Sequence, residues 1–152
     1  MLGILTLFLP LIGFLISCAI GKKFNNKISQ YSTSSLLIIS SILSWIIFFD
    51  ILFFPNVEKI YLFNWINSGD FNVDWSIRID SLTSVMLIII TNISAAIHVY
   101  SIGYMHNDKS ISRFMSYLSL FTFFMLCLVT SDNLLQLFFG WEGVGLASYL
   151  LI

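Results

Sequence analysis

The chain has 152 residues, of which 58% are hydrophobic and 10% are charged, and its formal net charge is −1. Because an ordinary soluble domain carries roughly 25% charged residues, this composition excludes that class, and the small net charge gives no basis for binding nucleic acid. Two cysteines and two histidines, all far apart, suit neither a metal cluster nor a disulfide framework. We therefore expect an all-α membrane protein without a metal or cofactor of its own.

Five segments are apolar enough to cross a bilayer, which takes about 20 residues of helix. They lie at about 2–21, 34–54, 82–105, 114–130 and 133–152, and we expect them to form a single membrane domain over residues 1–152. The first has its lysines after the apolar run, which is the wrong order for a cleaved signal peptide. Pro10 predicts a kink there, tolerated if a neighbouring helix covers the freed carbonyl.

Residues of about 60–80, between the second and third helices, have the pattern of a β-hairpin. The stretch "FNVDWSIRID" alternates apolar and polar residues, and "NSGD" before it is typical of a turn. Apolar residues share one side of the strand and polar residues the other: Phe71, Val73, Trp75, Ile77 and Ile79 against Asn72, Asp74, Ser76, Arg78 and Asp80. We expect the aromatic side to lie on helix ends.

The distribution of basic residues predicts the orientation in the membrane. Three lysines follow the first helix, and two basic residues lie in the loop before the fourth: Lys22, Lys23, Lys27, Lys109 and Arg113. The hairpin side has only Lys59 and Arg78. By the positive-inside rule, the lysine-rich loops face the inside, which is the matrix in a mitochondrion, and the hairpin faces the outside.

Glu142 is an acid in the middle of the apolar fifth segment. An ionised carboxylate at mid-membrane costs about 2.5–3.5 kcal/mol on insertion scales, so it must be neutral, paired with a cation or facing water. Desolvation favours the neutral acid and a nearby lysine favours the carboxylate, so a moving cation can make it take up and release a proton. We predict that Glu142 translocates protons; the alternative is a structural glutamate that only bonds to a neighbouring helix.

Small and polar residues near Glu142 recur at helical spacing. They are Gln136, Gly140, Gly143 and Ala147, and such a stripe lets another helix approach closely. On the third helix a polar stripe includes His98, with Thr91, Ser94, Ala95 and Ser101. Histidine titrates near neutral pH, so His98 is a candidate for a proton path. The alternative, which we favour slightly, is a histidine that is only hydrogen-bonded to a serine in the bundle.

Four acidic or basic residues outside these stripes have structural interpretations. Asp80 is expected to cap the third helix, and Asp132 to cap the fifth. Asp50, near the outer end of the second helix, is expected to reach interfacial water, and so is Asp132, for which the cap is a second interpretation. Arg78 and Asp80 are expected to be solvated hairpin charges.

At "SDNLLQLFFGWEGVGLASYLLI" the sequence resembles the fifth transmembrane helix of the large antiporter-like subunit of respiratory complex I, which is chain 5 in mitochondria and subunit L in bacteria. Upstream segments agree in the same order: "LPLIGF", "FNVDWSIRIDSLTSVMLIIIT", "HVYSIGYMHND" and "SRFMSYLSLFTFFMLCLVTSDN". The resemblance covers essentially the whole chain, and "GWEGVG" is its most specific part. It implies the N-terminal piece of an antiporter-like bundle.

The resemblance implies a share in proton translocation coupled to electron transfer from NADH to quinone. The family's fifth-helix glutamate matches Glu142 and pairs with a lysine on a later helix. Flavin, iron–sulfur clusters, NADH and quinone would belong to other subunits. The implied partners are other complex I membrane subunits, including the chain that carries the remaining helices, and the lipid bilayer. The expected location is the mitochondrial inner membrane, with the bacterial plasma membrane as the alternative.

Members of the family are several times longer than this sequence, so we expect either a fragment or the N-terminal piece of a split subunit. Two other functions stay open. One is a subunit of a multisubunit cation/proton antiporter, which has a similar plan without a link to NADH. The other is a structural role without conduction.

Overall fold

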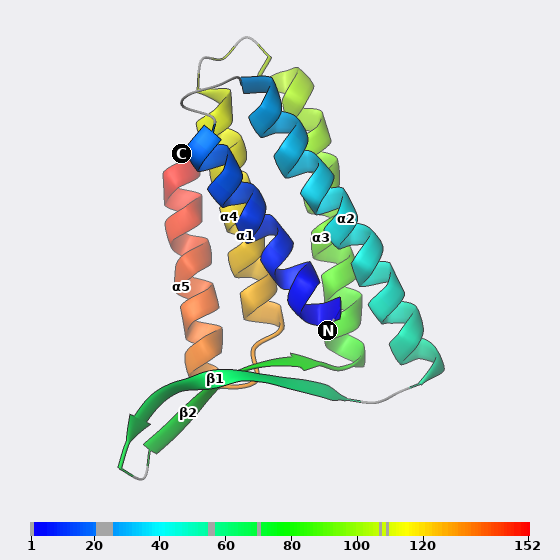
Figure 1. Cartoon of the computed structure of the whole chain (residues 1–152), viewed down its shortest axis with the longest axis vertical. Coiled ribbons are helices and arrows are strands. Elements are labelled where there is room, and N and C mark those ends of the chain that lie inside the picture. The colour runs from blue at the N-terminus through cyan, green and yellow to red at the C-terminus, as the bar shows by residue number, and fades with distance from the viewer. Residues whose placement is uncertain (1, 21–25, 55–56, 70, 107, 109) are drawn as a thin grey trace.

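In a computed structural model of the chain, five helices run alongside one another and a two-stranded hairpin lies across one end of them (Figure 1). The structure describes residues 2–20, 26–54, 57–69, 71–106, 108 and 110–152. The elements are α1 (Leu2–Ile20), α2 (Asn26–Phe53), β1 (Glu58–Ser68), β2 (Phe71–Ile79), α3 (Ser81–Tyr104), α4 (Ile111–Val129) and α5 (Leu134–Leu151). All five helices are long and apolar enough to span a membrane, which confirms a multi-pass membrane protein with a hairpin between α2 and α3.

The second helix begins at Asn26, eight residues before the predicted start at residue 34. The prediction was wrong because the stretch from Asn26 is rich in hydroxyl residues and has low hydropathy. In the structure two of these hydroxyl residues, Ser29 and Thr33, are fully buried. Thr33 Oγ1 donates to the Ser29 carbonyl one turn earlier, and Ser29 Oγ bonds to Ser17 of α1. Once its hydroxyls are satisfied in this way, a serine-rich segment continues a membrane helix.

Pro10 lies inside α1, and the carbonyl that it leaves without a partner belongs to Thr6. Ser40 Oγ of α2 donates a hydrogen bond of 2.9 Å to this Thr6 oxygen. Both Thr6 and Ser40 are buried. The expectation that a neighbouring helix covers the freed carbonyl is therefore confirmed, and the structure identifies the neighbour as α2.

The hairpin is antiparallel, and Gly69 in its turn has a φ of 59°, a conformation that glycine adopts without strain. The free edge of β2 is covered by the turn between α4 and α5. The Arg78 N–H donates to the Thr130 carbonyl at 3.0 Å, and Ile77 forms a bridge with Ser131. This contact ties the hairpin to the helices and hides an edge that would otherwise be exposed.

The predicted alternation of β2 is confirmed for most of the strand: Val73, Ile77 and Ile79 are buried. Ser76 departs from it, since it lies on the polar side yet is only 1% exposed. It is buried because the α4–α5 turn covers the strand at this residue, where Ser76 Oγ donates to Asp132. Trp75 packs on Phe139 of α5 with ring centroids 5.0 Å apart, so the aromatic side does lie on a helix end.

The hairpin end of the bundle has an apolar core. Its buried members come from all elements except β1 and α5: Leu7, Ile47, Ile51, Ile77, Ile79, Leu87, Leu126 and Cys127. Toward the opposite end the interior between α1, α2, α3 and α4 becomes rich in serine and threonine. α5 lies at the side of the bundle and packs mainly on α4 (Figure 1).

Candidate functional site

One face of α5 is packed tightly against α4. The buried residues of α5 are Gln136, Gly140, Gly143 and Ala147, the stripe that the sequence predicted. A Cβ added to Gly140 would lie 2.7 Å from the Leu128 backbone, and one added to Gly143 would overlap the Phe124 ring. A larger residue at either position would force α4 or the Phe124 ring to move, and the prediction of a close helix approach is confirmed.

Glu142 does not belong to this packed stripe. Its side chain is exposed, outside the buried stripe and about halfway along α5. It borders an open pocket of about 300 Å³ lined by Phe121, Trp141, Glu142, Val144, Gly145 and Ser148. A Cβ on Gly145 would meet nothing within 4 Å. Within the described residues, the Glu142 carboxylate thus lies on an open face of α5 with a pocket beside it. The small residues that pack against α4 lie on another face of the helix.

His98 is completely buried between α3 and α4. Its Nδ1 lies 2.8 Å from the Ser94 carbonyl, and its Nε2 lies 3.2 Å from Ser119 Oγ. Because a carbonyl oxygen can only accept, Nδ1 carries a proton in this arrangement. In the neutral ring Nε2 then accepts from the Ser119 hydroxyl. The structure supplies the serine partner that the sequence left open, and His98 as a proton carrier stays a prediction.

The other polar residues of the α3 stripe are buried too. Thr91 pairs with Ser44 of α2 at 2.8 Å, and Ser94 pairs with Thr122 of α4 at 2.5 Å. The stripe therefore faces the interior of the bundle, not lipid. No described hydrogen bond or ion pair joins it to Glu142, because α4 separates α3 from α5 (Figure 1).

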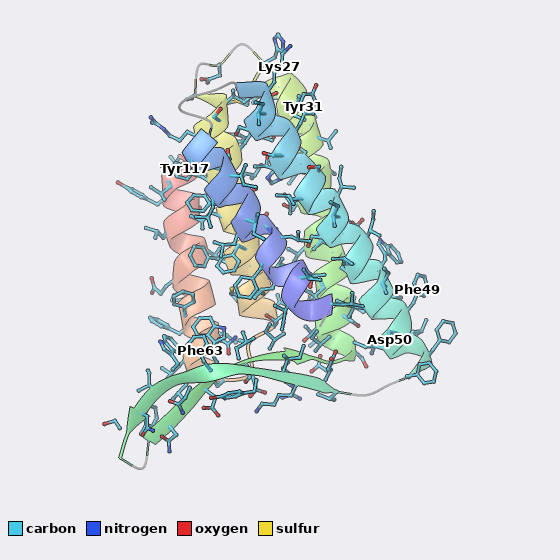
Figure 2. All side chains as sticks on the ribbon, in the orientation of Figure 1. Lys27, Tyr31, Phe49, Asp50, Phe63 and Tyr117 are labelled. Atoms are coloured by element: carbon cyan, nitrogen blue, oxygen red, sulfur yellow. The ribbon has the colours of Figure 1, made fainter. Side chains whose placement is uncertain are left out.

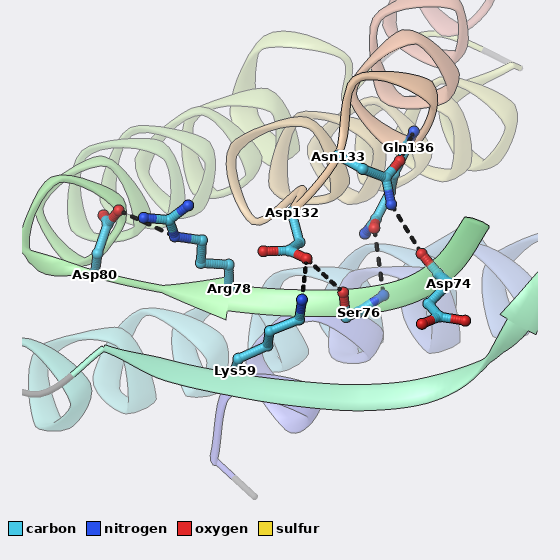
Figure 3. A network of polar contacts seen from close by, with 8 residues as sticks. All are labelled: Lys59, Asp74, Ser76, Arg78, Asp80, Asp132, Asn133 and Gln136. Atoms are coloured by element: carbon cyan, nitrogen blue, oxygen red, sulfur yellow. Dashed lines mark hydrogen bonds and ion pairs between the residues drawn. The ribbon is translucent and has the colours of Figure 1, made fainter. Parts of the chain in front are cut away.

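At the hairpin end, Asp132 lies at the centre of a polar cluster (Figure 3). Its Oδ2 lies 2.6 Å from Lys59 Nζ and accepts from Ser76 Oγ at 3.1 Å. The hydrogen bond from Lys59 lowers the pKa of Asp132, and the bond from Ser76 acts in the same direction, against partial burial. The prediction that Asp132 caps α5 was wrong: Asn133 is the cap, and its Oδ1 accepts from the Gln136 N–H. The side chain of Asp132 is already engaged by the hairpin.

The other predicted cap is confirmed. Asp80 precedes α3 and accepts from the Thr83 N–H at 2.8 Å, which lowers the pKa of Asp80. Arg78 Nε lies 3.6 Å from the same carboxylate, and both side chains stay partly exposed, as expected for hairpin charges. Asp50 is exposed near the hairpin end of α2, opposite the end that carries Lys27 (Figure 2).

Comparison with known proteins places these features in a family. A family described as "NADH-Ubiquinone oxidoreductase (complex I), chain 5 N-terminus" matches residues 65–115, from β1 to the start of α4. NADH-quinone oxidoreductase subunit L of Rickettsia felis is 50% identical over 151 residues, which is 99% of this chain. NADH-ubiquinone oxidoreductase chain 5 of Chondrus crispus is 51% identical over 149 residues, or 98% of this chain. The chain belongs to this family.

The match extends through α5, beyond the residues that the family description covers. Chain 5 of Phytophthora infestans is 48% identical over all 152 residues. The chain spans about a quarter of the length of the curated relatives that it matches: 23% for Rickettsia felis and 22% for Chondrus crispus.

Proposed function

We propose that this chain forms the first five helices of a membrane subunit of proton-pumping NADH:quinone oxidoreductase, in which Glu142 belongs to a proton path. The observation that carries the proposal is the position of Glu142. It lies near the middle of a membrane helix, on a face that no described residue covers, within a chain about 50% identical to complex I subunits. The names of the relatives support this reading over a cation/proton antiporter.

The physical argument starts from the cost of an acid at mid-membrane depth. When later helices cover the open face of α5, Glu142 must be neutral or have a cation beside it. The family resemblance implies a lysine on a later helix in that role. As the lysine approaches, the carboxylate is favoured and a proton leaves; as it withdraws, the neutral acid is favoured and a proton binds. The pocket beside Gly145 and Ser148 leaves space for such a side chain or for water.

The assignment to the complex is tested on native gels of solubilised membranes. The band that stains for NADH dehydrogenase activity is cut out and its peptides are identified by mass spectrometry. Peptides of this chain in the active band, together with flavin and iron–sulfur subunits, are the expected result. Their absence from that band, with presence in a band that lacks these subunits, would favour the antiporter. The same purification from mitochondria or from a bacterial membrane tests our placement in the mitochondrial inner membrane.

The role of Glu142 is tested by Glu142→Gln, which keeps the shape of the side chain but replaces the acid with an amide that cannot release or take up a proton. We expect proton pumping in vesicles to fall by at least about tenfold, since general acid–base groups contribute roughly 10²–10⁴-fold to proton-transfer steps. The amount of assembled complex on the native gel should not change. Asp50→Asn is the matched control, because Asp50 is exposed near a helix end and should tolerate the same change. Normal proton pumping by the Glu142→Gln variant would contradict a role in the proton path and would leave Glu142 only a structural role.

His98 is proposed as a lesser member of a proton path. Both ring nitrogens are hydrogen-bonded to protein atoms. A proton that binds Nε2 makes the ring an imidazolium, and it must leave again from Nε2, because the Ser94 backbone carbonyl bonded to Nδ1 cannot take up a proton. His98→Gln keeps a donor and an acceptor but cannot be protonated. We expect a severalfold loss of pumping with assembly retained. If only assembly changes, His98 holds α3 to α4 and does no more.

A further inference from the structure

The interior of α1–α4 contains a row of buried hydroxyl groups, which we call the seam. α4 supplies three of them at helical spacing: Ser116, Ser119 and Thr122. They bond in turn to Ser17 of α1, His98 of α3 and Ser94 of α3. Near the end that carries Lys27, Ser17 Oγ also donates to the Ser112 carbonyl in the first turn of α4. The seam therefore runs from that end of the helices to their middle.

The seam ends where the apolar core begins. One turn beyond Thr122 on α4 lies Leu126, which is fully buried among side chains of the core at the hairpin end. Ile77 and Ile79 of the hairpin are also fully buried in that core. A polar interior that reaches one end of the helices is thus closed at the other end by hydrocarbon and by the hairpin. The seam is therefore polar up to one end of the helices only, the end that carries Lys27.

One hydroxyl at the polar end lacks a protein partner. Ser34 of α2 is only 4% exposed, and its Oγ has no hydrogen bond to any described protein atom. Leaving a buried hydroxyl unpaired costs roughly 1–3 kcal/mol, and buried polar groups without a protein partner usually bind ordered water. The other buried side-chain hydroxyls of the described seam are paired within the protein. Ser34 Oγ therefore requires a hydrogen-bond partner that is not one of the described protein atoms.

The position of Ser34 can be fixed from its neighbours along α2. Ser41, two turns later on nearly the same face, donates to Asn92 of α3 at 2.9 Å. α2 and α3 run antiparallel, so Ser34 lies about 10 Å further toward the polar end. That level corresponds to the segment of α3 that contains the buried His98 and Ser101. The unpaired hydroxyl thus lies on the face of α2 that meets α3, at the level of His98 and Ser101.

From these observations we infer that water binds at Ser34 Oγ, and that the seam is a water-accessible half-channel. It opens at the Lys27 end, reaches the level of His98 and stops at the apolar core. By the positive-inside rule its mouth faces the inner side of the membrane. This path lies on the opposite side of α4 from Glu142, so it does not depend on the role proposed for that carboxylate.

The test measures access to a thiol introduced by Ser34→Cys in membranes that contain the assembled complex. The substitution is made in a Cys18→Ser background, which leaves the native Cys127 in the apolar core as an internal control. Ag⁺, which is small enough to follow a water-filled path, is added to vesicles of known orientation. Thiols that have not reacted are then labelled with a maleimide after denaturation and counted by mass spectrometry. Ile47→Cys, on the same helix but in the apolar core, is the matched control.

We expect the thiol of the Ser34→Cys variant to react from the Lys27 side at least about tenfold faster than Cys127 or the thiol of the Ile47→Cys variant, since thiol reactivity follows exposure to the reagent. Equal, slow reaction of all three would overturn the half-channel. If Ser34→Cys does not assemble, a density map of the unmodified complex decides instead. A water about 2.7–3.0 Å from Ser34 Oγ is expected, and a protein group bonded to that oxygen would overturn the inference. Neither result alters the pumping assay of Glu142→Gln, so the two proposals can fail separately.

Discussion

The two ends of the α1–α4 interior are held together by different interactions. At the hairpin end, aliphatic side chains such as Leu7, Leu87 and Leu126 pack without any polar partner. At the other end, hydroxyl pairs such as Ser116–Ser17 join the same helices. Aliphatic packing requires only matching shapes, whereas every buried hydroxyl requires a partner. The apolar end can therefore be dry and closed, and the polar end admits water wherever one partner is missing.

The largest effect is expected at the apolar end. Ile77→Ala removes a fully buried side chain that joins the hairpin to the helices. A cavity there should lower the free energy of unfolding by about 2–5 kcal/mol. Thermal unfolding of the purified protein in detergent measures it. Ile42→Ala is the matched control, because Ile42 is 56% exposed and its loss should change stability little. Equal losses in the two variants would contradict a special role for this core.

A smaller effect is expected at the polar contact beside Pro10. Ser40→Ala leaves the buried Thr6 carbonyl without a donor, which should cost about 1–3 kcal/mol. Pro10→Ala restores an N–H that can donate to the same carbonyl. Ser40→Ala should therefore cost clearly less in a Pro10→Ala background. A double-mutant cycle of unfolding free energies measures this coupling. Additive effects would show that the serine does not compensate for the proline.

The sequence predicted most of the fold because it contains strong periodic signals. The apolar runs predicted five helices, the alternation of "FNVDWSIRID" predicted β2, and Pro10 predicted a carbonyl that needs a donor. It could not predict Ser40 as that donor, because the partner depends on how two helices are aligned. It placed the start of α2 too late, because serine and threonine look hydrophilic until their hydroxyls find partners inside the bundle.

The candidate site shows the same limit. The stripe with Gly140 and Gly143 could be predicted from spacing, but its neighbour α4 could not. Glu142 could be singled out as an acid in an apolar helix, yet only the structure places it on the open face. The Asp132 cap failed because Asn133 offered an equally good capping side chain one residue later. Lys59 and Ser76, which are far away in the sequence, bind the side chain of Asp132 and so leave Asn133 to cap the helix.

The smallest effect is expected at the Lys59–Asp132 pair, which fastens the hairpin over the apolar end. Lys59 is 58% exposed, so the pair should stabilise the hairpin by no more than about 1 kcal/mol at pH 7. The pKa of Asp132 is lowered in the folded protein. Its contribution is therefore complete above the unfolded carboxyl pKa of about 3.9 and is lost as the pH falls through the lower folded value. Asp132→Asn should unfold more easily than the unmodified protein at neutral pH, and the difference should shrink in acid.

Proteolysis of the hairpin as a function of pH measures this difference, because cleavage follows local opening. Asp74→Asn is the matched control: Asp74 lies on the same strand, and its hydrogen bond from Asn64 is solvent-exposed. It should change the cleavage rate less than Asp132→Asn at neutral pH. A gap between Asp132→Asn and the unmodified protein that does not depend on pH would contradict the ion pair as its cause. The hairpin would then be held by Ile77, Ile79 and the backbone bond of Arg78 to Thr130, and the apolar end would be closed without any contribution from charge.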